Sequence, residues 1–224
     1  MTASHKSSKF LVAGIQLSGF KEEIMVTKQV KEALTEHYRE LFRTHGAVAA
    51  GVQGSDEGMV GRFAQLAKIA DLSDQSVLDL GCGYGGMYPY LKQLNQNMNY
   101  KGVDLVPESI EYAAQTYADA KWECRDILET PLTEDFDWVL ICGVFNNAMP
   151  NPTEFLKELT TAAWKSSVKG MGFNFISKHV NVVHEEMSYH DPLEVFQFCR
   201  TNFSNQVTMA HHYFRCDVSM FVYR

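Results

Sequence analysis

The feature that most constrains this chain is a glycine-rich turn at residues 77–86. A short apolar segment, Val77 to Leu80, has the composition of a buried strand, and four glycines follow it within six positions. Glycine permits positive φ angles and leaves no Cβ between the backbone and a ligand. The pattern therefore predicts a strand that turns sharply into a helix, with main-chain atoms open to a bound nucleoside.

The acid at position 79 bears on which nucleoside this turn binds. In a dinucleotide site, the amide N–H groups of the turn and the N-terminus of the next helix bind a pyrophosphate, and a neighbouring carboxylate repels that anion. S-adenosylmethionine carries a sulfonium and an ammonium group, and a carboxylate attracts both. Asp79 thus favours S-adenosylmethionine. The glycines alone do not decide, because Gly81-x-Gly83-x-x-Gly86 also fits the dinucleotide fingerprint.

Composition limits the class of partner. The 224 residues are 46% hydrophobic, enough for one domain with a sizeable core. The net charge is −7 and the basic residues form no stripe, so we expect no nucleic-acid partner. No apolar run reaches the ~18 residues of a membrane span, so we expect no membrane partner and a small-molecule substrate. Five cysteines without a Cys-x-x-Cys motif are typical of reduced thiols, which predicts a cytoplasmic protein. The sequence leaves a homodimer open.

The N-terminal part differs in pattern from the rest. Residues 1–28 lack a clear period, and apolar residues then recur at helical spacing up to about residue 46. Ser55 and the two acids after it form a helix cap. We therefore expect an N-terminal arm and helical lid over residues 1–58, and a ligand-binding domain over residues 59–224.

From residue 76 onward, strand and helix patterns alternate, which predicts a parallel sheet with right-handed crossovers. The expected strands are 77–80, 100–105, 122–124, 138–142 and 169–176, and the expected helices are 87–96, 107–118, 152–166 and 192–202. Two closing strands, 207–214 and 217–223, are joined by so short a link that they must pair antiparallel. The fold class is α/β: a Rossmann-like, seven-stranded, mostly parallel sheet with an antiparallel C-terminal hairpin.

With these features in order, residues 55–224 resemble the class I S-adenosylmethionine-dependent methyltransferases of the small-molecule type. The run Val77-Leu-Asp-Leu-Gly-Cys-Gly-Tyr-Gly85 is similar to the first motif of that family, and the terminal hairpin suits its sheet. The resemblance implies that S-adenosylmethionine is the cofactor and that a small organic acceptor receives its methyl group on O, N or C.

The resemblance also implies site residues. Asp104 would accept from the ribose hydroxyls, Asp126 and Ile127 would read the adenine edge, and Arg62 would pair with the carboxylate of the cofactor. The full set expected at the cofactor is Asp79, Gly81, Cys82, Gly83, Gly85, Asp104, Leu105, Asp126, Ile127 and Cys142, with Arg62 and Tyr38 from the lid. Phe145, Asn146 and Asn147 would form one wall of the substrate site.

One departure from the family pattern narrows the acceptor. Methyltransferases acting on adenine or amide nitrogen commonly carry an Asn/Asp-Pro-Pro-aromatic run after the fourth strand. This chain has Asn146-Asn-Ala-Met-Pro150 instead. The departure disfavours adenine and amide nitrogen as acceptors.

Acid–base candidates gather in the polar segment after the fifth expected strand. Histidine titrates near neutral pH and suits proton abstraction, so His179, His184, Tyr189 and His190 are the catalytic candidates, with His190 favoured. The alternative is that they are solvated loop residues and that Asp191 caps the helix beginning at Pro192. We expect no metal site, because the spacing of His179 and His184 fits neither a helical nor a strand face.

Two other functions stay open from the sequence. The same glycines and Asp104 fit an NAD(P)-dependent oxidoreductase, which would bind a nicotinamide cofactor and not S-adenosylmethionine. A non-catalytic nucleoside-binding partner protein would bind the cofactor without turnover.

Overall fold

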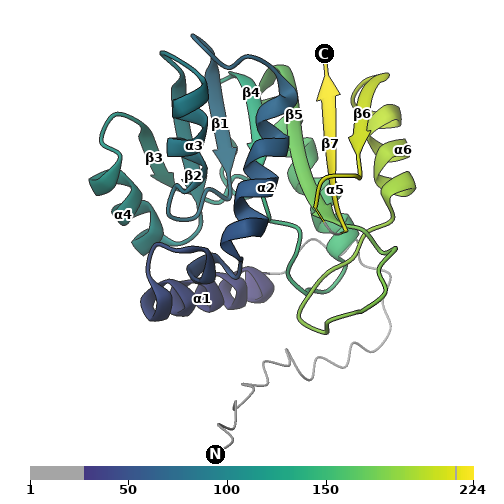
Figure 1. The fold of residues 1–224 in the computed structure, drawn as a ribbon, viewed down its shortest axis with the longest axis horizontal. Helices are drawn as coiled ribbons and strands as arrows, with labels where there is room; N and C mark the ends of the chain where they lie inside the picture. Colours follow the sequence, from purple (N-terminus) through teal and green to yellow (C-terminus); the bar gives the residue numbers. More distant parts are fainter. Residues whose placement is uncertain (1–27, 215) are drawn as a thin grey trace, which may run out of the picture.

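The computed structural model describes residues 28–214 and 216–224, and it forms a three-layer α/β fold (Figure 1). The arm expected over residues 1–28 therefore lies almost entirely outside the described residues. The sheet has seven strands in the order β3-β2-β1-β4-β5-β7-β6. These strands are β1 (Ser76–Leu80), β2 (Asn99–Asp104), β3 (Lys121–Cys124), β4 (Phe136–Ile141), β5 (Ser167–Ile176), β6 (Gln206–Ala210) and β7 (Asp217–Tyr223).

The first five strands run parallel, and β7 is antiparallel to both of its neighbours, β5 and β6. The predicted fold class and the closing hairpin are thus confirmed. Several predicted boundaries differ by one or two residues, and the largest error is in β6, which ends at Ala210 rather than at residue 214. His211 and His212 consequently lie in the link between the two strands.

The helices begin where local signals place them. They are α1 (Lys28–His45), α2 (Asp56–Leu66), α3 (Met87–Leu94), α4 (Pro107–Thr116), α5 (Pro152–Lys165) and α6 (Pro192–Asn202), with short 3₁₀ turns η1 (Ala49–Val52) and η2 (Ala67–Ile69). Ser55 Oγ accepts from Gly58 N at the start of α2, and Asp191 Oδ1 accepts from Leu193 N at the start of α6. Among the described residues, no helix combines the length and apolar composition that a membrane span requires.

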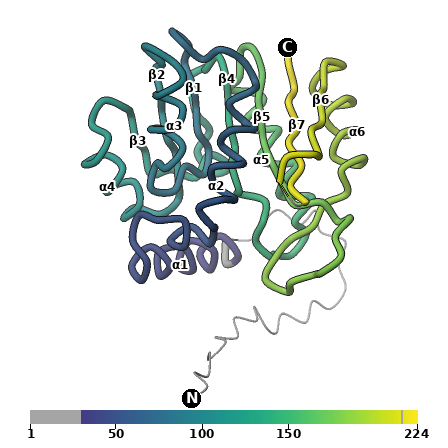
Figure 2. The backbone as a smooth tube through the Cα atoms, in the orientation of Figure 1, coloured from purple at the N-terminus to yellow at the C-terminus, as the bar shows by residue number. Residues whose placement is uncertain are grey.

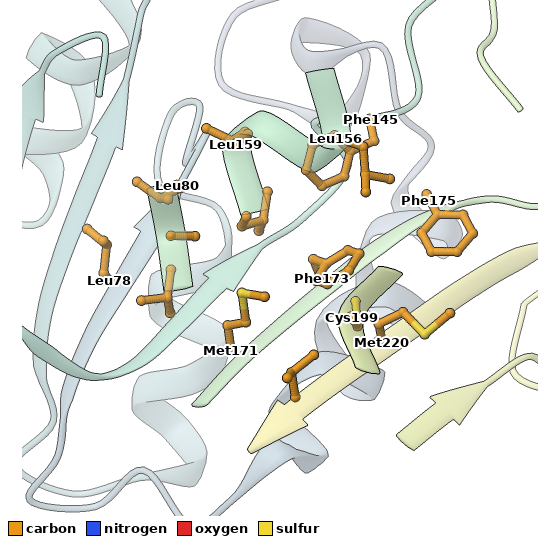
Figure 3. Packing of buried hydrophobic residues seen from close by; sticks show 14 of the residues in the cluster. Leu78, Leu80, Phe145, Leu156, Leu159, Met171, Phe173, Phe175, Cys199 and Met220 are labelled. Atoms are coloured by element: carbon orange, nitrogen blue, oxygen red, sulfur yellow. The ribbon is translucent and has the colours of Figure 1, made fainter. Parts of the chain in front are cut away.

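Both faces of the sheet are covered, which explains why residues 138–141 of β4 are all apolar and buried. Val139 and Ile141 of β4 belong to a core with α5 and α6, whereas Trp138 and Leu140 belong to a second core with α2 and α3. Figure 3 shows the first core, in which Leu78 of β1 and Met171 and Phe173 of β5 meet Leu156 and Leu159 of α5.

Helix α1 lies across the carboxyl ends of the parallel strands (Figures 1 and 2). Ion pairs attach it to the domain: Arg39 Nε lies 3.0 Å from Glu108 on α4, and Lys31 Nζ lies 2.6 Å from Asp126 after β3. The helix thereby roofs the edge of the sheet where ligands of open α/β folds bind.

Candidate cofactor and substrate cavity

A cavity of about 250 Å³ lies at the carboxyl ends of β1, β2 and β4, beneath α1. The strand order reverses between β1 and β4, so the cavity occupies the topological switch point of the sheet. We divide it into two halves. The β1–β3 half is lined by Asp79, residues 81–83, Asp104, Leu105, Asp126 and Ile127, and the β4–β5 half by Asn146, Asn147, Met149, Phe155, Leu159, Ile176 and Met187.

The glycine turn is held open by its own backbone. Gly81, Gly83 and Gly85 have φ angles of 73°, 54° and 82°, a region that other residues adopt only with strain. Gly81 N donates to Val103 O at 2.8 Å, which ties the turn to β2. The backbone that lines the cavity here is therefore rigid and free of side chains at the glycine positions.

One oxygen of the buried Asp79 carboxylate lacks a hydrogen-bond donor in the described part of the chain. Tyr100 donates a hydrogen bond to its Oδ2, whereas Oδ1 has no donor among the described residues. Burial, together with the negative charge of Asp104, raises the pKa of Asp79 to about 7, even though the Tyr100 bond opposes the shift. A cation in the cavity would satisfy this oxygen and favour its ionised form. The site therefore fits a cationic nucleoside.

Asp104 is positioned by two backbone donors. Gly83 N donates to Oδ2 at 2.8 Å, and Val106 N donates to Oδ1 at 2.9 Å. Burial raises the pKa of this carboxyl, against the lowering effect of those bonds. Each carboxylate oxygen has a further lone pair, so Asp104 can accept from two adjacent hydroxyls while it keeps both backbone bonds.

Asp126 has partners that the sequence did not reveal. Its Oδ2 lies 2.6 Å from Lys31 Nζ of α1, and its Oδ1 accepts from Leu128 N at 2.9 Å. Lys31 also lines the cavity. Asp126 thus links the roof helix to the β1–β3 half, besides the role in adenine recognition that the sequence predicts for it.

Arg62 and Tyr38 also line the cavity, and both contact the protein itself. Arg62 Nε and Nη2 donate to the two oxygens of the buried Asp217, at 2.8 and 3.3 Å. Tyr38 hydrogen-bonds with the side chain of Asn147, and burial together with Asp104 raises the pKa of its hydroxyl. Cys142, the remaining predicted cofactor contact with a side chain, lines the same space.

Six predicted site residues lie outside the cavity lining, namely Gly85, Phe145, His179, His184, Tyr189 and His190. A Cβ at Gly85 would meet the ring of Trp122, so this glycine permits close packing on the far side of the turn. Phe145 is 2% exposed and lies in the core, where Figure 3 places it beside Leu156. Its ring contacts the rings of Phe155 on α5 and Phe173 on β5.

The histidines predicted as bases do not converge. His179 and His184 are exposed, and Tyr189 accepts from the backbone N of His184 through its hydroxyl. His190 is buried, and burial lowers its pKa. Its Nε2 lies 3.1 Å from Phe145 O and its Nδ1 lies 3.3 Å from Thr153 Oγ1. His190 therefore joins the loop after β4 to the loop after β5, and its predicted catalytic role gains no support from its position.

Comparison with known proteins agrees with this geometry. Residues 77–163 match the family model of a methyltransferase domain. These residues form a methyltransferase domain. A Mycobacterium tuberculosis protein named as a methyltransferase is 26% identical over 144 residues, which cover 62% of this chain and 86% of that protein. The predicted enzyme class is therefore confirmed.

Two solved structures share the fold of this methyltransferase. Magnesium protoporphyrin IX methyltransferase from Synechocystis PCC 6803, with bound S-adenosylhomocysteine, has a TM-score of 0.63 at 16% identity and covers 85% of this chain and 99% of its own. The N-methyltransferase NodS from Bradyrhizobium japonicum, in complex with S-adenosylhomocysteine, has a TM-score of 0.61 at 15% identity, with shares of 84% and 97%.

Proposed function

We propose that this methyltransferase binds S-adenosylmethionine along the β1–β3 half of the cavity and transfers its methyl group to O, N or C of a small organic acceptor in the β4–β5 half. The observation that carries the proposal is the buried Asp79 carboxylate, whose Oδ1 has no donor among the described residues although it lines the cavity at the glycine turn. A buried anion needs a partner, and the cofactor is a cation. A dinucleotide pyrophosphate would instead be repelled.

The cofactor, when bound, supplies a methyl group that its sulfonium has already activated, so the chain acts mainly by alignment and exclusion of water. Asp104 accepts from the two ribose hydroxyls, and Leu105 and Ile127 provide apolar contact for the adenine. Arg62 lines the cavity and its pair with Asp217 fixes the guanidinium. This arginine would pair with the carboxylate of the cofactor. The choice of cofactor is supported by both structural neighbours named above, which were solved with S-adenosylhomocysteine.

Calorimetric titration tests the proposal against its rivals. S-adenosylmethionine and S-adenosylhomocysteine should both bind the folded protein, and NAD(P)H should not. Binding of NAD(P)H in place of the two would establish the oxidoreductase. Binding of the cofactor without methyl transfer to any acceptor would leave the partner protein as the better account.

Asp104→Ala is expected to weaken cofactor binding by about 1–3 kcal/mol, because two charge-assisted hydrogen bonds to the ribose are lost. The dissociation constant for S-adenosylhomocysteine, measured by calorimetry, checks this. Asp135→Ala is the matched control, because Asp135 is exposed and far from the cavity lining. An unchanged affinity in Asp104→Ala would mean that the ribose is held elsewhere.

We also propose that residues 1–58 act as a lid. Within the described part, α1 and η1 contribute Lys31, Leu34, Tyr38 and Val52 to the cavity lining, and ion pairs to Asp126 and Glu108 hold α1 down. A ligand beneath α1 adds contacts that exist only while the helix is docked. Cofactor binding should therefore stabilise the docked position.

Limited trypsin digestion checks the lid. Cofactor at saturation is expected to slow cleavage at Lys31 and Arg39 by about tenfold, because the protease acts on the undocked helix. Cleavage at Arg200 on α6, which lies outside the cavity lining, serves as the internal control. Equal digestion of α1 with and without cofactor would contradict the lid.

A further inference from the structure

Asn146 presents a second unmet hydrogen-bonding group in the same cavity. The residue is 9% exposed and lines the β4–β5 half, and its side-chain Oδ1 has no donor among the described residues. Buried acceptors in folded proteins are normally paired, so an orphan that lines a cavity points to a ligand with an N–H or O–H group. In the described structure, Asp79 Oδ1 is the unpaired acceptor in the β1–β3 half of the cavity.

The position of Asn146 is fixed by its backbone. Its carbonyl accepts from Ser188 N at 2.8 Å, and the carbonyl of the preceding residue, Phe145, contacts His190 Nε2. Asn147 O accepts from Ser188 Oγ at 2.6 Å, and Ala148 N donates to Glu186 O at 3.0 Å. The segment 145–148 is thus bound along its length to the segment 186–190. The orphan amide is held in place before any ligand arrives.

The residues around Asn146 indicate the polarity and charge of that ligand. The β4–β5 half is lined by apolar side chains, namely Met149, Phe155, Leu159, Ile176 and Met187. The cations that line the cavity are each paired with a carboxylate: Lys31 with Asp126, Arg62 with Asp217 and Arg125 with Glu123. Within the described part of the chain, Asp79 and Asp104 have no such ion pair, so the charge around the cavity is negative on balance. An apolar molecule that is neutral or cationic suits this space, and an anion is disfavoured.

The amide oxygen of Asn146 suits a nitrogen nucleophile better than an oxygen nucleophile. An amide oxygen accepts a hydrogen bond but is too weak a base to take a proton. An alcohol must give up its O–H proton to become a strong nucleophile, so a hydrogen bond from that proton to Asn146 would not activate it. An aliphatic amine, once its ammonium form has given a proton to water, attacks with its lone pair and keeps at least one N–H. The hydrogen bond from that N–H strengthens as positive charge develops on nitrogen.

We propose, resting on the methyl-transfer function above, that the acceptor is a primary or secondary aliphatic amine with an apolar body, and that Asn146 Oδ1 accepts its N–H. The ammonium form of the amine first gives a proton to water, since its pKa lies near that of lysine. The freed nitrogen lone pair then forms the bond to the methyl carbon while the carbon–sulfur bond breaks and its electron pair stays on sulfur, and the methylated nitrogen carries the positive charge. Asn146 is then a substrate-binding residue that orients the lone pair and stabilises the charge.

Three isosteric series test the acceptor class on protein saturated with S-adenosylhomocysteine. Each series holds an amine, an alcohol and a carboxylate: phenethylamine, 2-phenylethanol and phenylacetate; tryptamine, tryptophol and indole-3-acetate; hexylamine, 1-hexanol and hexanoate. The amine is expected to bind at least about tenfold tighter than its two isosteres in the best-fitting series. With S-adenosylmethionine, mass spectrometry should then show the N-methylated amine. Tighter binding of an alcohol or carboxylate, or no discrimination in any series, overturns the inference.

Variants at position 146 test the role of the amide. Asn146→Leu should raise the dissociation constant of the best amine about tenfold or more, whereas Asn146→Asp, which keeps the oxygen, should retain or strengthen it. Asn146→Ala gives the same comparison with less volume, and Asn202→Leu on α6 is the surface control. If the three Asn146 variants bind the amine as tightly as wild type and the Asn202→Leu control do, the inference is overturned. Affinity for S-adenosylhomocysteine should stay constant throughout, and failure of wild type to bind it would instead overturn the methyl-transfer function and this inference with it.

Discussion

Asp79→Asn is expected to weaken binding of S-adenosylmethionine by about 2–5 kcal/mol and, at the same time, to make the cofactor-free protein more stable at pH 8. The loss of affinity follows because the variant removes the charge that faces the cationic cofactor in a buried site. By the relation between free energy and affinity, this corresponds to at least about a 30-fold rise in Kd.

The gain in stability follows from the raised pKa of Asp79. The folded protein holds this pKa at about 7, against an ordinary value of 3.8, because burial disfavours the charged form. The carboxyl therefore contributes stability that is fully present below about pH 4 and is lost as pH rises through about 7. Above that pH the ionised group costs at most about 4 kcal/mol, and asparagine avoids this cost. The advantage of the variant should shrink as pH falls from 7 towards 4.

Urea unfolding at pH 8 and pH 5, with calorimetry between pH 6 and 8, measures both effects. The affinity of the wild type for cofactor should rise with pH up to about 7, because only the ionised carboxylate pairs with the cation. The affinity of Asp79→Asn should be independent of pH in that window. Asp135→Asn controls for a change of net charge on the surface. A variant that binds cofactor normally, or that is less stable than wild type at pH 8, would refute the pairing of Asp79 with the cofactor.

Local patterns were sufficient to predict the fold class. The glycine turn, the helix cap at Ser55 and the short link before β7 each depend on residues close in sequence, and each formed as expected. The sequence did not predict the order of the strands, because that order depends on which distant strands pair. The β1–β3 half of the cavity was predictable from local patterns, because each of its residues lies at or just after the carboxyl end of a strand.

The rest of the cavity depends on contacts between distant residues. Lys31 and Asp126 are 95 positions apart, and Arg62 and Asp217 are 155 positions apart, so no local pattern pairs them. The histidine prediction failed to gain support for a related reason: the environment of His190 comes from Phe145 and Thr153 on another loop. A sequence segment rich in histidines shows that imidazoles are present, but only tertiary structure decides whether they face a ligand.

Gly81→Ala is expected to destabilise the protein by about 3–5 kcal/mol, whereas Gly46→Ala should cost only about 1–2 kcal/mol. The two glycines share a φ angle of 73°, so the backbone strain of adding a side chain is the same. They differ in their surroundings. A Cβ at Gly81 would overlap Val144 Cγ2, whereas a Cβ at Gly46, just after α1, would meet nothing within 4 Å. The difference between the variants therefore isolates the overlap.

This overlap connects the turn to the acceptor half of the cavity, since Val144 lies two residues before Asn146. The free energies of unfolding of Gly81→Ala, Val144→Ala and the double variant form a cycle that measures the coupling. We expect the double variant to recover at least about 1 kcal/mol relative to additive losses, because Val144→Ala removes the clashing methyl group. Equal destabilisation by Gly81→Ala and Gly46→Ala, with no coupling to Val144, would show that the loop after β4 yields freely. Glycine would then be needed at position 81 only for its φ angle, and not for the close approach between the cofactor turn and the loop that carries Asn146.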